Sequence, residues 1–233
     1  MKNYVAFRDH IVTCYPQEGC GVILNELFYP IDNIHPEPSN NFMFSEKDCL
    51  ELLDKEYTII HSHTMERFDC DPRTPSLEDM ICRNNTQVPH GIVHCDGKNI
   101  SEILYFGAIN TEELLGRSYI SNVFDCFTIA RDFLYKEANI DIGLHPRPPE
   151  WEEWNPYYIL HTYKDIGFID VEETDSYQVG DILLFAISSN KINHIGIYLE
   201  ENKFIHHLYN RKSCEDSISK WSKHLIKTIR LVR

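Results

Sequence analysis

The 233-residue sequence contains no uninterrupted apolar run that approaches the length of a membrane span, which for a helix is about 20 residues. Its first residues, MKNYVAFRDHIVTC, lack both an apolar core segment and a small-residue cleavage site, so we expect no secretory signal. Internal repeats and low-complexity tracts are also missing. These absences indicate a globular protein that is made in a cytoplasm and does not insert into a membrane.

Basic residues are scarce: 22 Lys and Arg stand against 36 Asp and Glu, and the formal net charge is −14. Nucleic acid is therefore not an expected partner, because its phosphates would be repelled over most of the surface. The eight cysteines show no compact framework spacing, which favours reduced thiols over a disulfide scaffold. Hydrophobic residues make up 42% of the chain, enough for the core of one large domain or of two ordinary ones.

The first half of the chain is predicted to form a hairpin, two helices and three further strands. In chain order these are the hairpin strands Gly19–Leu24 and Phe28–Ile31, a helix from Ser45 to about Leu53, the strand Tyr57–His63, a helix with Pro75 at its first position, and the strands His90–Cys95 and Glu102–Ile109.

The second half is predicted to contain a helix that begins at Cys126 and, further on, one antiparallel sheet. The predicted strands of this sheet are Asp181–Ile187, His194–Glu200, Lys203–Tyr209 and Thr228–Val232. The style of alternation changes after about Ala108, and we expect a boundary near Ile109–Leu115. The sequence thus predicts an α+β protein of two domains, residues 1–109 and 110–233.

Two histidines occupy the end of the predicted strand Tyr57–His63. His61 and His63 are two residues apart, so their side chains point to the same face of the strand. Together with Asp79 they would supply three ligands, the usual protein contribution to a catalytic Zn²⁺, with the fourth place left to water. The alternative is a pair of ordinary surface histidines, because His-x-His occurs by chance on many strands.

Two more residues would complete such a site. Glu18 could accept a proton from the water at the metal. Ser76 is three residues before Asp79 and shares its helix face, so the Ser76 hydroxyl could stabilise an oxyanion.

The segments PQEGCGVI, HSH and PSLED, in this order, resemble the signature of the JAMM/MPN metalloproteases, which is a glutamate before a Cys-Gly pair, then His-x-His and Ser-x-x-Asp. The resemblance covers about residues 1–108 and implies an α-β-α zinc metalloprotease domain. Thr64 stands where that family usually has proline. The loop before Ser76 is also longer than usual and adds Asp69, Cys70 and Asp71, which either compete as ligands or form a solvated loop.

Cys126 is the candidate nucleophile of the second half. Asp125 is a natural N-cap, so Cys126 would lie in the first helical turn, where the helix dipole and unpaired amide N–H groups favour a thiolate. His194 and His206 are expected on neighbouring strands joined by a turn around Glu200–Asn202. His194 would take the thiol proton, and His206 would hold the productive tautomer. The alternative is an inert buried thiol, the interpretation kept for the other seven cysteines.

The segments LLGRSYISNVFDCFTIARDF, VGDILLF and NHIGIYLEENKFIHH, in this order, resemble the NlpC/P60 cysteine peptidases across about residues 110–233. The resemblance implies a papain-like fold and cleavage of cell-wall peptides. It also implies Cys126 as nucleophile, His194 as base and His206 as orienting residue, with Tyr119 shaping the oxyanion site.

A JAMM-like domain followed by an NlpC/P60-like domain resembles a family of bacteriophage tail proteins. The resemblance implies a tail-tip hydrolase that is made in the host cytoplasm, travels in the virion tail and acts at the bacterial cell wall. Its partners would be peptidoglycan peptides and other tail-tip proteins, its cofactor would be Zn²⁺, and the zinc domain would process a tail protein during assembly. Two alternatives remain: a non-catalytic structural component of the tail tip, and an enzyme that transfers the acyl group to an amine instead of water.

Overall fold

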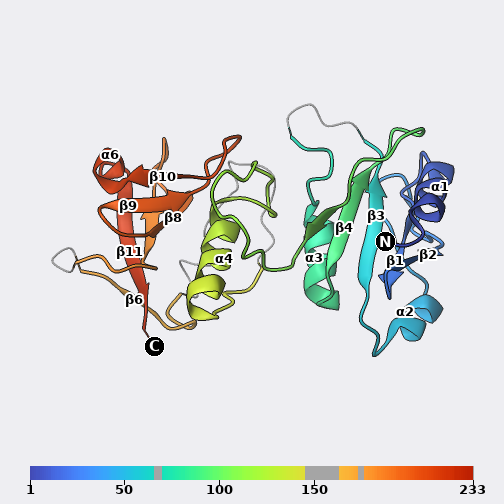
Figure 1. Cartoon of the computed structure of the whole chain (residues 1–233), viewed down its shortest axis with the longest axis horizontal. Coiled ribbons are helices and arrows are strands. Elements are labelled where there is room, and N and C mark those ends of the chain that lie inside the picture. The colour runs from blue at the N-terminus through green and yellow to red at the C-terminus, as the bar shows by residue number, and fades with distance from the viewer. Residues whose placement is uncertain (66–69, 145–162, 173–175, 233) are drawn as a thin grey trace. The chain divides into compact units, whose positions relative to one another are not determined.

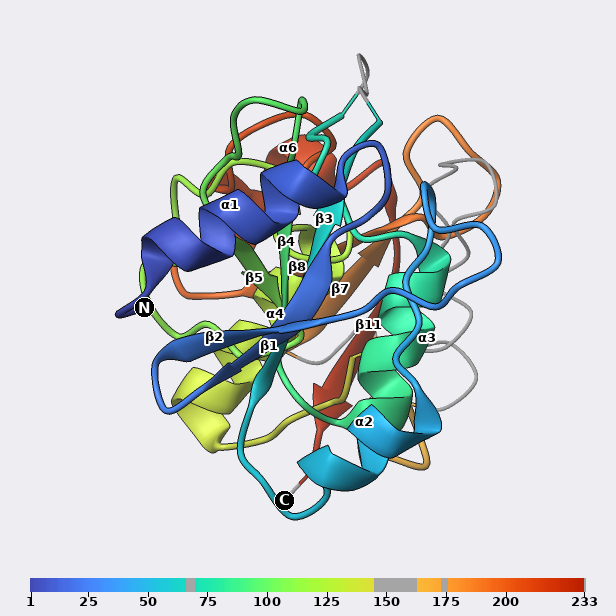
Figure 2. The same ribbon diagram turned by 90° about the vertical axis from the view of Figure 1, so that its right-hand side faces the viewer.

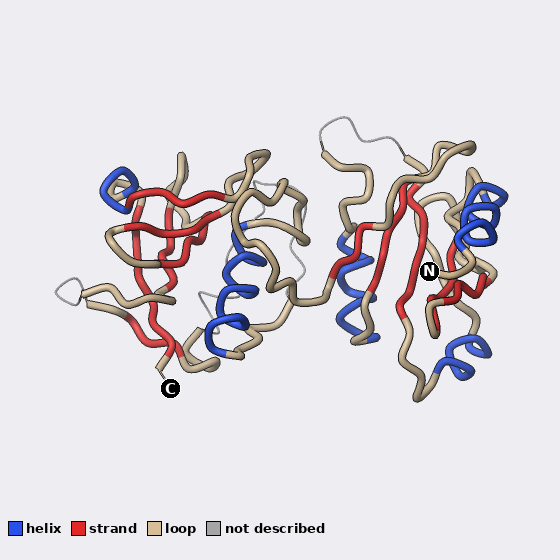
Figure 3. Tube along the Cα trace, in the orientation of Figure 1, coloured by secondary structure: helices blue, strands red, loops and turns tan. Residues whose placement is uncertain are grey.

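The computed structural model describes residues 1–65, 70–144, 163–172 and 176–232 of the chain (Figure 1). The chain forms two compact units, Met1–Ala108 and Ile109–Arg233, which we call the N-terminal and C-terminal units. Each unit has its own β-sheet (Figure 3). Within the described ranges, no helix is both long enough and apolar enough to cross a membrane.

The sheet of the N-terminal unit has five strands in the order β2-β1-β3-β4-β5. They are β1 (Cys20–Leu24), β2 (Leu27–Ile31), β3 (Thr58–His63), β4 (His90–His94) and β5 (Leu104–Phe106). Strands β3 and β4 run parallel, and the other neighbours are antiparallel. Asn25 and Glu26 join β1 to β2 with positive φ angles of 51° and 67°, as a tight hairpin turn requires. The predicted strands of the first half are therefore confirmed.

Helices cover both faces of this sheet (Figure 2). The helices are α1 (Tyr4–Cys14), α2 (Glu46–Leu52) and α3 (Leu77–Thr86). Consecutive strand residues point to opposite faces: Ile60 packs in a cluster with Phe7 of α1, and Ile59 packs in another with Leu52 of α2. His61 is two residues from Ile59, so the first of the two predicted ligand histidines lies on the α2 side of the sheet.

The predicted start of α3 was wrong by two residues. Ser76, not Pro75, sets the beginning of the helix: its side chain accepts from the Asp79 backbone N–H, and the Asp79 side chain accepts from the Ser76 backbone N–H. This reciprocal capping box satisfies two amide donors that a helix start otherwise leaves unpaired. Pro75 therefore precedes the helix.

The sheet of the C-terminal unit has six antiparallel strands in the order β10-β9-β8-β7-β11-β6. They are β6 (Phe168–Asp170), β7 (Ile182–Phe185), β8 (His194–Tyr198), β9 (Lys203–His206), β10 (Cys214–Ser217) and β11 (Leu225–Leu231). The four predicted strands are confirmed. Strands β6 and β10 were missed, because β6 has only three residues and the sequence of β10, CEDS, has no hydrophobic alternation to identify it.

Two helices pack on opposite faces of this second sheet. Helix α4 (Cys126–Ala138) contributes Phe127 and Ile129 to a core with Ile195 and Ile205. On the other face, helix α6 (Ile218–Trp221) packs in a cluster with Phe204. His194 and His206 are next to Ile195 and Ile205 in the sequence, and since strand residues alternate between faces, both histidines lie on the α6 side.

The core under α4 should dominate the stability of the C-terminal unit. Ile229 and Ile226 lie on the same strand, β11, but Ile229 is 0% exposed and Ile226 is 59% exposed. We expect Ile229→Ala to lower the free energy of unfolding by about 2–5 kcal/mol, because it leaves a cavity. The control Ile226→Ala should change it by about 0.5 kcal/mol or less.

Denaturant titration followed by tryptophan fluorescence measures both variants, because all three tryptophans lie in the C-terminal half of the sequence. Equal losses in the two variants would contradict the assignment of the core.

Candidate functional sites

Three polar side chains converge where β3 ends and α3 begins. His61 Nε2 lies 3.3 Å from His63 Nε2 and 3.1 Å from Asp79 Oδ1, and His63 Nε2 lies 3.2 Å from Asp79 Oδ2. With bonds of about 2.0–2.1 Å, two ligand atoms on a tetrahedral zinc ion stand about 3.3 Å apart. The type of donor and the 3.3 Å separation of the two Nε2 atoms therefore fit zinc, and each imidazole lies near a different oxygen of Asp79.

Neighbouring groups orient each of these potential ligands. His63 Nδ1 donates to the carbonyl oxygen of Pro72 at 2.9 Å, so Nε2, the ring nitrogen on the side of Asp79, is the one that would bind a metal. Asp79 Oδ2 accepts from the backbone N–H and the hydroxyl of Ser76, both at 2.8 Å. His61 is fully buried and stacks on Phe42 with ring centroids 4.5 Å apart.

The charges within this cluster are complementary. Burial alone would raise the pKa of Asp79, but the imidazoles of His61 and His63 hold that pKa well below its usual value. Burial opposes charge on His61, yet the Asp79 carboxylate raises the pKa of His61. A buried carboxylate that keeps its negative charge beside two imidazoles is a favourable environment for a cation.

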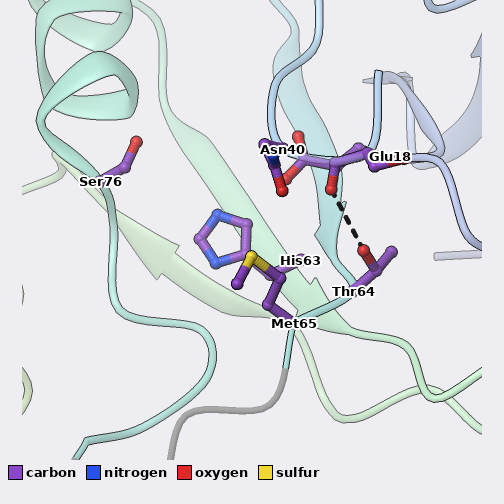
Figure 4. A pocket seen from close by; sticks show the side chains of 7 residues that line it. Glu18, Asn40, His63, Thr64, Met65 and Ser76 are labelled. Atoms are coloured by element: carbon purple, nitrogen blue, oxygen red, sulfur yellow. Dashed lines mark hydrogen bonds between the residues drawn. The ribbon is translucent and has the colours of Figure 1, made fainter. Parts of the chain in front are cut away.

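Glu18 and Ser76 lie with His63 around a pocket of about 130 Å³ (Figure 4). Burial raises the pKa of Glu18 despite the opposing effect of the two histidines, which brings this carboxyl closer to the range of a base at neutral pH. The single hydroxyl hydrogen of Ser76 is already donated to Asp79. The predicted oxyanion role of Ser76 would therefore require that hydrogen to leave Asp79.

The longer loop before Ser76 offered three competing ligands. The Asp71 carboxylate instead accepts two hydrogen bonds from the Arg73 guanidinium, at 2.9 and 2.7 Å. Among the described residues, the metal-ligand cluster of this unit contains neither Asp71 nor Cys70. Asp69 lies outside the described residues. Neither Asp71 nor Cys70 is therefore a competing ligand among the described residues.

In the C-terminal unit, Cys126 is the first residue of α4, as predicted. Asp125 caps the helix: its Oδ1 accepts from the backbone N–H groups of Phe127 and Thr128, both at 3.0 Å. Helix α4 packs against β8 and β9, and Cys126 belongs to the same core as Ile195, the residue after His194. The cysteine thus sits at the positive end of a helix that lies on the histidine-bearing strands.

His194 and His206 form a buried pair. The turn between β8 and β9 uses Glu201 and Asn202 at φ angles of 52° and 62°, and the resulting register pairs His206 with Gly196. His194 is two residues from Gly196 and so lies on the same face. His194 Nε2 comes within 2.9 Å of His206 Nδ1, and the side chains are 4% and 0% exposed.

Burial decides the protonation of this pair. It lowers the pKa of His206 to about 4, although Asp216 acts in the opposite direction. Burial, followed by the neighbouring His206, also lowers the pKa of His194 well below its usual value. Both imidazoles are therefore neutral at pH 7, and each carries one N–H.

The partners of His206 determine which nitrogen carries each hydrogen. His206 Nε2 lies 3.4 Å from Asp216 Oδ2, and because a carboxylate oxygen can only accept, this neighbour favours a hydrogen on Nε2. In that arrangement His206 Nδ1 accepts from His194 Nε2–H at 2.9 Å, and the lone pair of His194 is on Nδ1. This is the tautomer in which His194 can act as a base.

Three residues around the histidine pair were missed by the sequence analysis. Trp221 packs on both rings, with centroids 5.0 Å from His206 and 6.1 Å from His194, and its indole N–H donates to Asp216 at 3.1 Å. Cys214 Sγ lies 3.5 Å from His206 Nε2, although the sequence analysis treated Cys214 as an ordinary thiol. No local motif marks these residues, because strand pairing brings them to His206.

Tyr119 lies edge-on to His207, with ring centroids 5.4 Å apart. His207 Nε2 lies 3.0 Å from the carbonyl oxygen of Arg211, so the surroundings of His207 differ from those of His206.

A larger pocket of about 480 Å³ lies along the C-terminal half of α4. Its first α4 residue is Phe133, about 10 Å along the helix from Cys126, so this pocket is separate from the candidate nucleophile.

Comparison with known proteins defines the class of the C-terminal unit. The model of the NlpC/P60 family matches residues 106–230, more than half of the chain. The chain belongs to the NlpC/P60 family, as the cysteine and histidine segments predicted.

Two relatives are phage tail proteins. The chain is 28% identical over 222 residues to the tail tip assembly protein K of Escherichia phage N15. This alignment covers 91% of this chain and 86% of the relative. It is 29% identical over 111 residues to the tail tip assembly protein K of Escherichia phage lambda. That alignment covers 47% of this chain and 55% of the relative. The predicted similarity to phage tail proteins is therefore confirmed, whereas the JAMM/MPN resemblance stays a prediction.

Solved structures of the same family also match. The NlpC/P60 domain of the peptidoglycan hydrolase SagA is 18% identical, covers 52% of this chain and 92% of its own, and has a TM-score of 0.34. NlpC1 from Trichomonas vaginalis is 22% identical, covers 57% of this chain and 51% of its own, and has a TM-score of 0.37.

The cap at the start of α4 gives a direct test of how Cys126 is positioned. We expect Asp125→Ala to lower the free energy of unfolding by about 1–2 kcal/mol, because two backbone N–H groups lose their acceptor. Asp125→Asn keeps one side-chain oxygen and should lose less. Urea titration of both variants measures the difference, and an Asp125→Ala protein as stable as the wild type would contradict the capping role.

Proposed function

We propose that the C-terminal unit is a cysteine peptidase that hydrolyses amide bonds in the stem peptides of peptidoglycan. The hydrogen bond between His194 and His206 carries the proposal, because it leaves the His194 Nδ1 lone pair free to accept a proton. The position of Cys126 at the start of α4 supplies the matching thiol. Membership of the NlpC/P60 family supports both the reaction class and a peptidoglycan substrate.

The reaction would proceed through an acyl-enzyme. Cys126 Sγ attacks the amide carbonyl carbon while His194 Nδ1 takes the thiol proton. The C–N bond then breaks as His194 returns that proton to the leaving amine, and a thioester joins Cys126 to the acyl part. His194 next takes a proton from water, the resulting hydroxide attacks the thioester carbonyl, and the C–S bond breaks to release the acid and the thiolate.

His206 acts in this scheme as a positioning residue. It accepts from His194 Nε2–H in every step and so keeps His194 in one orientation and one tautomer. Asp216 holds the hydrogen of His206 on Nε2, and the Trp221 indole N–H holds Asp216. In this chain of hydrogen bonds, His194 donates to His206 and His206 donates to Asp216. The Nδ1 atom of His194, at the start of the chain, therefore keeps a lone pair that can accept a proton.

We propose that the N-terminal unit binds zinc through His61, His63 and Asp79. The ion would supply a Lewis acid that polarises a substrate carbonyl and lowers the pKa of water. Within the chain, Ser76 orients Asp79, Pro72 orients His63, and Glu18 is placed to hold a proton at the edge of the pocket. A zinc peptidase that processes a tail protein during assembly is the function that these roles fit.

The similarity to tail tip assembly proteins supports a site of action in a phage tail. The chain would be made in the host cytoplasm, associate with other tail-tip proteins and meet the bacterial cell wall as part of the virion. This setting brings the proposed peptidase to its peptidoglycan substrate without a separate export route.

Replacement of Cys126 tests the peptidase. With purified muropeptides as substrate, Cys126→Ala should lower the rate of cleavage by about 1000-fold or more, as expected for loss of a covalent nucleophile. The matched control is Cys49→Ala, since Cys49 is an exposed free cysteine in the other unit.

Product masses separate the alternatives for this site. A mass gain of one water identifies hydrolysis, and a product joined to an amine identifies acyl transfer. Equal cleavage by Cys126→Ala and wild type would discard Cys126 as the nucleophile. A wild type that cleaves nothing, with intact virions from Cys126→Ala phage, would favour the purely structural alternative.

Metal analysis tests the zinc site. After zinc loading and dialysis, the double variant His61→Ala/His63→Ala should hold about one equivalent less than the wild type, since three ligands define one site. His35→Ala is the control, because His35 lies in the same unit but outside the ligand cluster. Unchanged zinc content in the double variant would refute the site.

A further inference from the structure

A second group of metal-binding atoms lies beside the histidine pair. Strand β10 pairs with β9 so that Cys214 stands directly opposite His206, and Asp216, two residues on, lies on the same face. The Sγ atom of Cys214, the Nε2 atom of His206 and a carboxylate oxygen of Asp216 all lie within 4.8 Å of one another. The register of one strand pair thus brings three different ligand types together.

The separations match those around a zinc ion. Cys214 Sγ lies 3.5 Å and Asp216 Oδ2 3.4 Å from His206 Nε2. With bonds of about 2.3 Å to sulfur and 2.0–2.2 Å to nitrogen and oxygen, a tetrahedral ion sets these distances at about 3.6 and 3.4 Å. Only a small adjustment of the side chains would be needed to bind the ion.

The surroundings also suit a cation. His206 is fully buried and held by His194, and Asp216 is held by the Trp221 indole N–H, so two of the three ligands are already oriented. Cys214 is exposed on the edge strand of the sheet, which gives an ion access and leaves a fourth position to water. Without an ion, a single N–H on His206 Nε2 faces both the thiol and the carboxylate and cannot fully satisfy both.

We propose that His206, Cys214 and Asp216 bind a zinc-type divalent cation, and that this binding switches off the Cys126 site. The second half of this statement rests on the proposed peptidase function. The metal site itself does not, because it involves no property of Cys126.

The switch follows from the hydrogen bond between the two imidazoles. A cation on His206 Nε2 takes the lone pair there, so the ring hydrogen of His206 must sit on Nδ1. His206 Nδ1–H then donates to His194 Nε2, and the hydrogen of His194 moves to its Nδ1. The atom that should accept the Cys126 proton now carries one of its own. Each imidazole keeps one hydrogen, and the Cys214 thiol releases its proton to solvent.

Cobalt binding to the full-length protein tests the site. We expect wild type treated with a chelator and then loaded with Co²⁺ to show the near-ultraviolet absorption of thiolate bound to cobalt, and Cys214→Ser to lose it. Cys49→Ser, which removes an exposed thiol of the other unit, should keep the absorption, and so should Cys126→Ala. Asp216→Asn should weaken binding. An absorption that is the same in wild type and Cys214→Ser would overturn the metal site.

The rate of muropeptide cleavage tests the switch, with each variant compared with its own metal-free rate. Saturating Zn²⁺ should slow the wild type and Cys49→Ser by about 100-fold or more, the usual contribution of a general base, and should slow Cys214→Ser far less. Equal inhibition of Cys214→Ser and wild type would overturn the switch and indicate zinc bound at Cys126 and His194 themselves. A metal-free wild type without Cys126-dependent cleavage would refute the peptidase, while the cobalt spectrum would still decide the metal site.

Discussion

The proposed chemistry of the C-terminal unit depends on one hydrogen bond, the contact between His194 Nε2 and His206 Nδ1. Two neutral imidazoles can make this contact in only two ways, and the choice decides whether His194 offers a lone pair or a hydrogen to its surroundings. The hairpin of β8 and β9 fixes the rings relative to each other, and burial keeps both neutral. The groups that contact His206 Nε2 therefore decide which of the two arrangements forms.

Both units use a pair of histidines, but strand geometry brings each pair together differently. His61 and His63 alternate along a single strand, so one period of the β-structure suffices to place them side by side. His194 and His206 lie on neighbouring strands, and a two-residue turn with positive φ angles sets their register. The first arrangement brings two Nε2 atoms to within 3.3 Å of each other beside Asp79, whereas the second joins the two rings by a direct hydrogen bond.

The sequence predicted the parts of the fold that have a local signal. Periodicity identified the five strands of the first sheet and four of the six strands of the second, and the capping residues Asp125 and Ser45 predicted two helix starts. Pro75 was misplaced because proline suits both the first helical position and the residue before a cap. Strand β10 could not be found, since short polar edge strands carry no hydrophobic pattern.

The residues of the candidate sites likewise fall into those with a local sequence signal and those without one. Motif spacing predicted His61, His63 and Asp79, and the structure gathers them. It also predicted His194 and His206, which form the buried pair. Trp221, Cys214 and Asp216 reach His206 only through the pairing of β9 with β10 and the following helix, and nothing in the local sequence records that pairing. The residues that orient a ligand or a base are thus harder to read from sequence than those that act directly.

In the N-terminal unit, Asp79 Oδ2 is part of both the N-terminal cap of α3 and the group of possible metal ligands. Asp79 Oδ2 accepts both hydrogens of Ser76 at the start of α3 and also lies 3.2 Å from His63 Nε2. Fraying of the first turn of α3 would carry this oxygen away from the imidazoles, and a bound ion would in turn resist that fraying. The stability of the first turn of α3 and the affinity for a cation should therefore be coupled. A substitution of Asp79 should lower both, whereas a substitution of His61 or His63 should lower the cation affinity alone.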